Sequence, residues 1–555
     1  MKITTYMKHQ FSRVNKIDDK AAKIASCFFV MITTVYPAFT GFGGYSNMVM
    51  KKTLFFWIVS GTIVVAMLIL LACETGSDRI SACDIGKTRI YKPTITEIAL
   101  MLFIVCTLIS AVLSFINNPN WINHRFNGAK VLFGENDRYE GLITFLYYAI
   151  TFVIVARFYT LQRFHLSLIA MSSIFVSLVG VLQLLGFDVF RLNASFIPQE
   201  YGPLSYIQRT TLGNVNLVSS YCSFTVLLFA ALFTVSHSKC QYLYLGTCMC
   251  SYALSFTTGF SGDAHKVAIL GAMILLIPYW VSGRERLGKI IIVLSGWCVI
   301  YASYSAYMSN MKRQLETRVD FAPNDRLLLN TYTHKNIALY LIMAAALLCV
   351  GLVLLFLVKK WPKKLMRIVG TVLLIILLSG GLIGLEVIGA RLSDQPENII
   401  WQAREMMHGR LSDDFGSARG WVWRNAIEVI PDHPVFGTGP DTLFHALGME
   451  RQYESLERYG FGFDKAHNVF LQITVCMGIP ALIAYASFLC SVFIPSIKKA
   501  FEQPVVFAFG AAALSYVIQS FFAVEVPIAT PLLWISLGVM ARELGKSEND
   551  RKDVI

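Results

Sequence analysis

The sequence predicts an all-α fold: a polytopic transmembrane helical bundle of about 12–14 spans, with one large extracytoplasmic loop that contains short helices. Two observations predict this fold class. Hydrophobic residues make up 55% of the 555-residue chain and charged residues only 15%, whereas soluble domains are about 25% charged. Apolar runs of roughly 18 or more residues also recur along the chain, and runs of that length can cross a bilayer. The composition therefore excludes a soluble globular enzyme.

The net charge of +13 would suggest a nucleic-acid partner in a soluble protein, but here most Lys and Arg flank apolar runs. With the N-terminus in the cytoplasm, the inside segments carry about twice as many Lys and Arg as the outside loops, as the positive-inside rule requires. We therefore expect a multi-pass protein of the cytoplasmic (cell) membrane with both termini inside. Its surroundings would be the lipid bilayer, and no nucleic acid is expected to bind.

The expected organisation follows from these runs and charges. The first 21 residues are polar and basic, so no cleavable signal peptide is expected. Two long apolar runs, 267–282 and 468–497, are each expected to form a single span. The expected parts are a cytoplasmic segment 1–21; a transmembrane region 22–388 with external loops near 115–139, 186–214 and 307–335; a large extracytoplasmic loop 389–466; C-terminal transmembrane helices 467–544; and a cytoplasmic tail 545–555.

The large loop carries an arginine- and tryptophan-rich stretch, RGWVWRNAIEVIPDHP, that begins at Arg419. Its apolar residues have helical spacing, and the two prolines are expected to end that helix. Arg419 and Arg424 are candidates to bind diphosphate oxygens, because guanidinium groups bind phosphate bidentately and stay charged. Trp421 is expected either to stack on a sugar ring or to lie in the interfacial aromatic belt.

His467 is the best candidate for a catalytic side chain. The sequence DKAHN places it where the aqueous loop becomes an apolar helix, and a histidine there can titrate near neutrality. It would accept a proton or a hydrogen bond from an attacking hydroxyl; the alternative is an interfacial histidine that only solvates the helix end. Asn468 and Gln472 are four residues apart, so one helix face would present both amides to a glycan.

A second group of polar residues stands at the starts of other apolar runs. Arg209 precedes the segment Gly213-Asn214-Val215-Asn216, and the backbone N–H groups of a helix start there would favour an anion; the alternative is a surface arginine. Lys266, with Asp263 and His265, lies in a short external link, and polar groups so near a span are expected to line a cavity. The same holds for Glu386 and Glu525.

No carboxylate cluster has metal spacing, and no P-loop or dinucleotide-binding glycine pattern occurs, so no metal and no cofactor are expected.

Several of these stretches resemble the O-antigen ligase/polymerase superfamily of membrane glycosyltransferases. The segment DKAHNVFLQITVCMGIP is similar to the HN and GIP signature of that family. The segment RGWVWRNAIEVIPDHPVFGTGPDTLF is similar to the stretch that precedes the signature, and TTLGNVN and NDRYEGLITF are similar to two further elements. The resemblances occur in the expected order through roughly residues 139–490.

The resemblance implies a metal-independent glycosyltransferase of cell-surface or cell-wall polysaccharide biosynthesis. Its donor would be an undecaprenyl-diphosphate-linked glycan, and its acceptor a sugar, lipid or protein at the outer face of the membrane. His467 would then be the essential loop histidine that activates the acceptor, Arg419 would contact the diphosphate, and Arg209 would be a second anion contact. The family includes both ligases and polymerases, and partners in polysaccharide assembly are expected.

The chain departs from the family pattern at one position. Many members carry SRGA where this sequence reads Ser261-Gly262-Asp263-Ala264, so Lys266 or Arg209 would have to supply the missing charge.

Two other classes of function remain compatible with the sequence: a transporter or flippase of lipid-linked oligosaccharides, and a non-catalytic scaffold of a polysaccharide assembly complex. A transporter would be expected to show repeats, and none is evident.

Overall fold

The computed structural model is helical in every regular element that it describes, which confirms the predicted fold class. It describes residues 19–41, 44–45, 47–77, 93–117, 129–135, 138–192, 209–257, 264–315, 336–395 and 398–546. Parts of the expected external loops 115–139, 186–214 and 307–335, both terminal segments and residues 261–263 of the SGDA link therefore lie outside the described residues.

Nine of the described helices are long and apolar enough to cross a membrane, and three shorter helices are also apolar. The first candidate span is Asp19–Ala38, which contains a π-helical turn. The remaining elements, in chain order, are α3 (Met48–Ser77), α4 (Ile95–Asn117), α6 (Ala129–Phe133), α7 (Leu142–Phe158), α8 (Arg163–Leu184), α9 (Val215–Val235), α10 (Cys240–Thr257), α11 (Ala264–Leu275), α12 (Ile277–Ser282), α13 (Arg284–Leu315), α15 (Ile337–Phe356), α16 (Lys363–Arg391), α17 (Ile399–Met407), α18 (Phe415–Val429), α19 (Leu443–Tyr459), α20 (Val469–Met477), α21 (Ile479–Lys499), α22 (Pro504–Ser520) and α23 (Thr530–Leu544).

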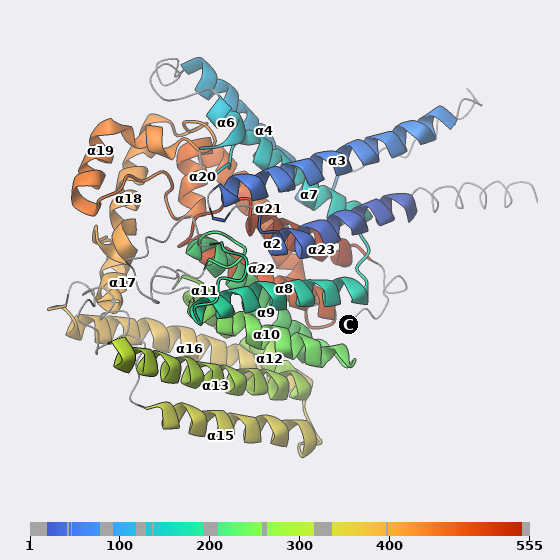
Figure 1. The fold of residues 1–555 in the computed structure, drawn as a ribbon, viewed down its shortest axis with the longest axis vertical. Coiled ribbons are helices and arrows are strands. Elements are labelled where there is room, and N and C mark those ends of the chain that lie inside the picture. The colour runs from blue at the N-terminus through green and yellow to red at the C-terminus, as the bar shows by residue number, and fades with distance from the viewer. Residues whose placement is uncertain are drawn as a thin grey trace, which may run out of the picture.

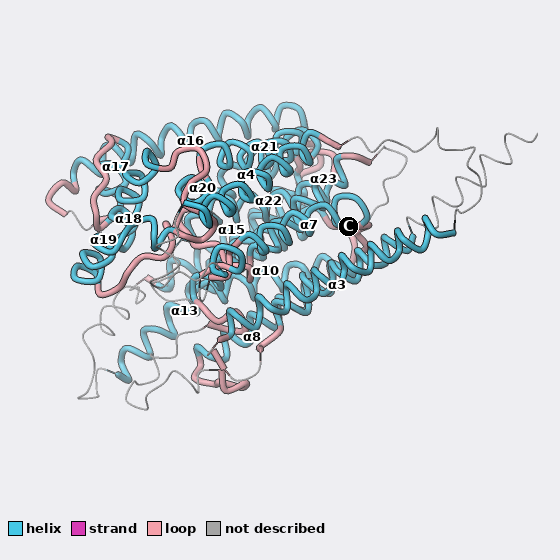
Figure 2. Tube along the Cα trace, turned by 90° about the horizontal axis from the view of Figure 1, so that it is seen from above, coloured by secondary structure: helices cyan, strands magenta, loops and turns pink. Residues whose placement is uncertain are grey.

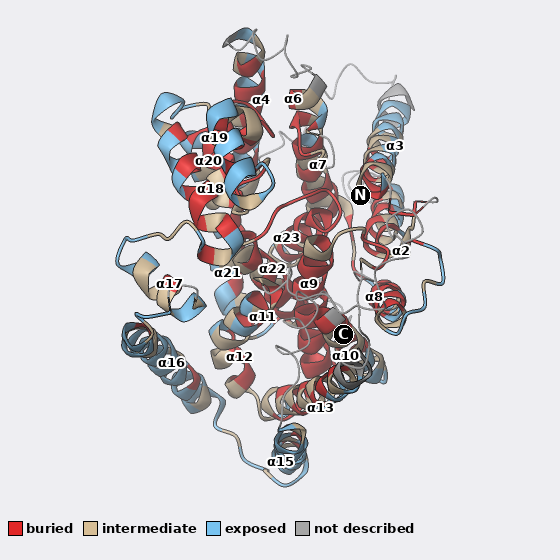
Figure 3. Cartoon of the chain, turned by 60° about the vertical axis from the view of Figure 1, so that its left-hand side comes forward, coloured by how far each residue is buried: buried red, intermediate tan, exposed pale blue. Residues whose placement is uncertain are grey.

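The centre of the bundle is formed by α9, which packs against α10 and α22, and by the pair α7 and α23. Every residue from Leu217 to Val235 is buried, so α9 is covered on all sides. By contrast, α15 and α16 are strongly apolar but mostly exposed, and Figure 3 shows both at the edge of the molecule. An apolar helix surface that no protein covers is the surface expected to face lipid tails.

The large polar segment forms the helices α17, α18 and α19 at one side of the bundle, beside α20 (Figures 1 and 2). This confirms the expectation that the loop contains short helices. The stretch that begins at Arg419 lies in α18, which ends at Val429, and a 3₁₀ turn follows over Ile430–Asp432. The two prolines therefore end the helix as expected, because neither can donate a backbone hydrogen bond.

Two expected spans are each broken into two helices, so the prediction of a single span was wrong in both places. Residues 468–497 form α20 and α21, which are separated at Gly478, and the break is stabilised because Gly478 has a φ of 89° and Pro480 opens the next helix. Residues 267–282 form α11 and α12, which meet at Leu276 ahead of Pro278. In each case proline at the start of a helix fits because the first N–H groups of a helix have no intrahelical partner.

Candidate active site

The loop turn PVFGTGP docks onto the end of α20. The N–H groups of Thr438 and Gly439 donate to the carbonyls of Val475 and Cys476 at 3.1 and 2.8 Å. These carbonyls belong to the last turn of α20, where carbonyls lack partners within the helix; the Cys476 carbonyl also accepts from the hydroxyl of Ser110 at 2.8 Å. A Cβ atom on Gly437, which has a φ of 62°, would lie 2.4 Å from the Cys476 carbonyl carbon. The close approach of two backbones therefore explains the glycine at position 437.

The docked turn also brings Asp441 under the loop that precedes α20. Lys465 Nζ lies 2.6 Å from Asp441 Oδ1 and 2.8 Å from Glu140 Oε2, and all three side chains are buried. His467 follows Lys465 by two residues and begins the connection to α20. Buried charges are stable only when they are paired and hydrogen-bonded, so this ion triad holds the His467 segment to the turn that precedes α7.

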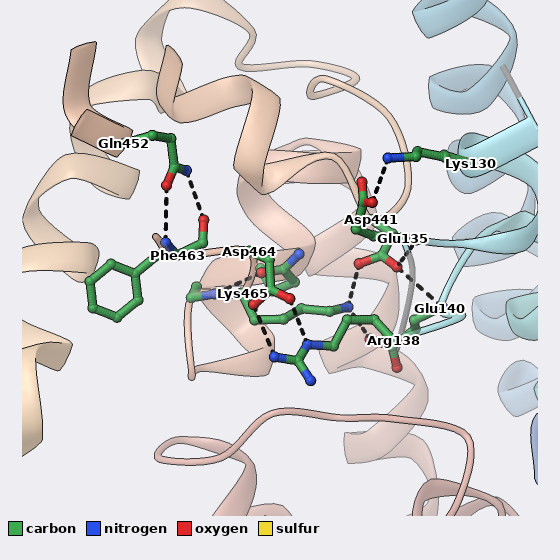
Figure 4. Close-up of polar contacts among 11 residues, drawn as sticks. Lys130, Glu135, Arg138, Glu140, Asp441, Gln452, Phe463, Asp464 and Lys465 are labelled. Carbon is green, nitrogen blue, oxygen red and sulfur yellow. Dashed lines mark hydrogen bonds and ion pairs between the residues drawn. The ribbon is translucent and has the colours of Figure 1, made fainter. Parts of the chain in front are cut away.

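A second ion pair runs parallel to the first (Figure 4). Arg138 and Asp464 are joined by two contacts, Nε–Oδ2 at 2.8 Å and Nη2–Oδ1 at 3.1 Å. The backbone N–H groups of Glu135 and Glu140 donate to Asp441 Oδ2 at 2.8 and 3.3 Å. The segments RYE and DK therefore pair side by side, although they are more than 320 residues apart in sequence.

The tryptophans of α18 support the same segment from the other side. Trp421 is fully buried, stacks on Phe463 with ring centres 5.5 Å apart, and donates from Nε1 to Glu454. Trp423 donates from Nε1 to the carbonyl of Ala466 at 2.8 Å. In this conformation both rings are covered by protein, and they pack against the segment that leads to His467.

His467 is partly buried, and its backbone is left-handed, with a φ of 51°. Its Nδ1 atom is buried and has no hydrogen-bond partner among the described residues. Burial, followed by the positive charges of Arg419, Arg138 and Lys465, lowers the pKa of His467 to about 3. The imidazole is therefore neutral at physiological pH and can accept a hydrogen bond or a proton. A non-glycine residue with positive φ is strained, and such strain is typical of functional sites.

Arg419 is the cation beside His467 that no carboxylate neutralises within the described part of the chain. Its guanidinium donates to the carbonyl of Gly416, while its Nε is buried without a partner. Residues 416–418, immediately before it, are all left-handed. Burial lowers the pKa of Arg419, but a guanidinium stays charged at physiological pH. The side chain is thus half-buried, positively charged and available to an anion.

Arg424 has different surroundings from Arg419. It is exposed and lies 2.7 Å from Asp413, which also binds Arg458 at 2.9 Å. Its charge is therefore already balanced. Arg419 lies near enough to His467 for its charge to help lower the histidine pKa, whereas Arg424 belongs to a separate surface ion network.

A small cavity of about 20 Å³ adjoins His467, and this is room for about one water molecule. Among its lining residues are Asn468 and Gln472, together with Glu140 and Glu525. Asn468 caps α20, with its side-chain oxygen accepting from the N–H of Leu471, and Gln472 accepts from the N–H of Ala466. Both amides therefore hold the backbone around His467 while they line the cavity.

The two glutamates of this cavity have raised pKa values. Burial, opposed by Lys465 and reinforced by Asp441, raises the pKa of Glu140 to about 7. Burial and the charge of Glu140 raise the pKa of Glu525 to about 8, and Ser520, which donates to Glu525, lowers it in part. Glu525 lies in the link between α22 and α23, and the sequence had indicated it as a cavity residue. Each side chain can therefore gain or lose a proton near neutral pH.

Glu525→Gln is expected to remove a pH dependence of stability. Because the pKa of Glu525 in the folded protein lies above that of an exposed glutamate, the protonated form stabilises the fold. That stabilisation is lost as pH rises through about 8, so wild type should lose about 1 kcal/mol between pH 7 and 9. Thermal unfolding of the purified protein at both pH values measures this. The variant should lose less than wild type, whereas the exposed control Glu457→Gln should behave as wild type; equal losses in all three would contradict the assignment.

The remaining candidates lie at other starts of helices. Arg209 lies over the ring of Tyr45 at 5.6 Å. Asn214 caps α9 by accepting from the N–H of Asn216 at 2.8 Å. Lys266, on α11, lies 5.9 Å from the ring centre of Phe256 and lines a mostly apolar cavity of about 600 Å³. These contacts form separate groups from the one around His467.

Sequence reasoning missed the role of Arg138, Glu140, Asp441 and Lys465. The RYEG and DKAHN motifs were both visible in the sequence. Their opposite charge order, Arg-x-Glu in one and Asp-Lys in the other, was the signal that could have indicated a contact between them. The family resemblance of the two motifs did not by itself indicate that they touch.

Fold and site together define a polytopic α-helical membrane protein whose polar loop holds a partly buried histidine near an arginine that no carboxylate neutralises among the described residues. Residues 338–486 match the family model described as O-Antigen ligase. This segment contains Arg419, the docked turn and His467, and the match confirms the resemblance to the O-antigen ligase superfamily. No curated protein and no solved structure matches the chain.

Proposed function

We propose that this protein is a membrane glycosyltransferase that moves an undecaprenyl-diphosphate-linked glycan onto an acceptor at the outer face of the cytoplasmic membrane. The observation that carries the proposal is a neutral histidine, His467, near a half-buried arginine, Arg419, that has no carboxylate partner in the described structure. A transferase for a diphosphate-linked donor needs one group to receive a proton and another to stabilise the additional negative charge that the diphosphate gains as it leaves.

In this proposal the donor diphosphate binds against Arg419. Its negative charge would offset the cations that now depress the pKa of His467. Removing part of that electrostatic effect would raise the histidine pKa, so His467 would become a stronger base only when the donor is present. This coupling would limit proton transfer to the complex that holds both substrates.

The chemical step is one displacement. The acceptor hydroxyl oxygen forms a bond to the anomeric carbon of the donor glycan, and the bond from that carbon to the diphosphate oxygen breaks. The diphosphate leaves with the electron pair, stabilised by Arg419, and the hydroxyl proton passes to His467. The cavity beside His467 has room for a water molecule rather than a sugar. A water bound there would connect His467 with Glu140 or Glu525.

The other site residues predicted from the sequence have supporting roles in this proposal. The apolar cavity that Lys266 lines is suited to part of the lipid chain. Arg209 with Asn214 and Asn216 would form a second polar contact at the head of α9. Trp421, Asn468 and Gln472 would act by holding the backbone of the His467 segment.

Comparison of two arginine variants tests the proposal. In purified protein supplied with a radiolabelled undecaprenyl-diphosphate glycan, Arg419→Gln is expected to lower transfer by about 100-fold, because a charge-stabilising contact to the leaving group is lost. Arg424→Gln should stay within about threefold of wild type, because exposed ion pairs contribute about 1 kcal/mol or less. Both variants remove one positive charge from the same helix. Equal losses would contradict the assignment of Arg419.

A further inference from the structure

A large cavity lies at the opposite end of the helices that carry the His467 site. It has a volume of about 690 Å³, within the range of about 300–1,000 Å³ that is typical of ligand pockets. The cavity is bordered by the beginning of α4 and the ends of α7 and α23, whereas the His467 site adjoins the beginning of α7. The two sites are therefore separated by the length of the bundle.

Two of the three cations in this cavity already have carboxylate partners. Arg157 binds Glu97 through two contacts, one of which joins Nε to Oε1 at 2.5 Å. Glu97 also accepts from the backbone N–H and hydroxyl of Thr94. Lys546 lies 2.5 Å from a carboxylate oxygen of Glu543. These two ion pairs therefore contribute little net charge to the cavity.

Arg542 is the third cation, and no carboxylate pairs with it within the described ranges. Its Nη1 donates to the backbone carbonyl of Arg157 at 2.6 Å, which fixes the guanidinium at the cavity wall. Its Nε is buried and has no hydrogen-bond partner. A buried polar atom without a partner costs free energy unless a ligand or water satisfies it. The cavity thus holds one fixed positive charge with unused donor capacity.

The rest of the lining shows what kind of anion would fit. Thr94, Thr96, Thr160 and Ser491 supply hydroxyl groups near the charged residues. Much of the remaining wall is apolar. The apolar lining residues are Phe152, Ala156, Leu161, Val492, Pro495, Ala541 and Leu544. A ligand that fills this space would carry both a negative charge and an apolar part.

We infer that this cavity binds the phosphate headgroup of an anionic membrane phospholipid, with Arg542 as the main contact and the apolar wall against the upper part of an acyl chain. The sequence places these helix ends among the basic inside segments, the side at which anionic lipids meet basic pockets between helices. A free phosphate would leave the apolar wall uncovered. The site is distinct from the proposed glycan-transfer site and does not depend on it.

Lipid titration of the purified full-length protein in detergent tests the inference. Phosphatidylglycerol is compared with phosphatidylcholine of the same chain length and with inorganic phosphate, and bound lipid is counted by native mass spectrometry while Tm is followed. Phosphatidylglycerol should bind at least tenfold more tightly than phosphatidylcholine and raise Tm, because a ligand of the folded state stabilises it. Equal binding of both lipids, or equal binding of inorganic phosphate alone, would overturn it.

Variants locate the binding. Arg542→Gln should weaken phosphatidylglycerol binding at least tenfold. Lys498→Gln removes a charge from the exposed end of α21 and should bind as wild type does. Should Arg542→Gln fail to fold, Ala156→Leu fills the apolar wall and keeps every charge, and it should also lose the lipid. Phosphatidylglycerol binding that survives both Arg542→Gln and Ala156→Leu would contradict the site. None of these readouts requires glycan transfer.

Discussion

His467→Ala is expected to reduce glycan transfer by about 100-fold or more, since a positioned proton acceptor typically contributes a factor of about 10²–10⁴. The imidazole is held neutral beside Arg419, and alanine offers no atom that can receive the hydroxyl proton. The measurement is the initial rate of label transfer from an undecaprenyl-diphosphate glycan by purified protein. Membrane insertion and Tm should change little, because His467 is partly exposed and its Nδ1 makes no hydrogen bond.

A second histidine in the same loop provides the control. His433 lies after α18 and is exposed, so His433→Ala should transfer glycan at the wild-type rate. If His467→Ala kept that rate as well, His467 would be an interfacial histidine that solvates the helix end, and the proposed proton acceptor would have to be abandoned.

Lys465→Met is expected to be among the most destabilising single substitutions in the loop. It removes the only charge that lies between Glu140 and Asp441 in the ion triad, and leaves two buried carboxylates facing each other. Burial alone would lower the pKa of Lys465, but Asp441 and Glu140 more than offset it, so the pKa is raised and the ammonium stays charged. Breaking a buried ion pair from one side typically costs about 3–5 kcal/mol. Thermal unfolding of the purified variant measures the loss.

A double variant separates the ion triad from simple packing. In Lys465→Met combined with Glu140→Gln, one of the two uncompensated carboxylates is gone, so part of the lost stability should return. Interacting sites show such non-additivity, whereas independent sites add. Strictly additive losses, or a loss below about 1 kcal/mol for Lys465→Met alone, would show that the triad does not hold this loop.

The sequence was informative wherever one local pattern decided the structure. Apolar runs predicted the helical bundle, the spacing in WVWRNAIEVI predicted α18, and the polar-to-apolar change predicted that His467 stands at the start of a helix. In each case the signal lies within a single segment. The break at Gly478 also had a local signal, a glycine followed two residues later by Pro480, but the length of the apolar run favoured a single span.

The contacts that assemble the site could not be predicted in this way. Arg138 pairs with Asp464, and Glu140 with Lys465, across more than 320 residues. The opposite charge order of the two segments becomes a signal only when they are compared, because neither segment alone identifies its distant partner. Trp421 shows the same limit of local reasoning. Its indole suggested a sugar platform or a belt residue, while its burial against Phe463 arises from how α18 packs on the loop. Arg419 and Arg424 are close together in sequence but likewise differ, because Arg424 pairs with Asp413 and Arg419 does not.

The most direct test of the proposed transferase follows both products of the reaction. Wild-type protein is reconstituted in vesicles with the labelled undecaprenyl-diphosphate glycan and an acceptor, without any nucleotide sugar. Labelled glycan is expected to appear on the acceptor, with one undecaprenyl diphosphate released for each glycan transferred. Movement of intact donor across the bilayer, with no glycosidic bond broken and no undecaprenyl diphosphate released, would contradict the proposal and would instead indicate a transporter.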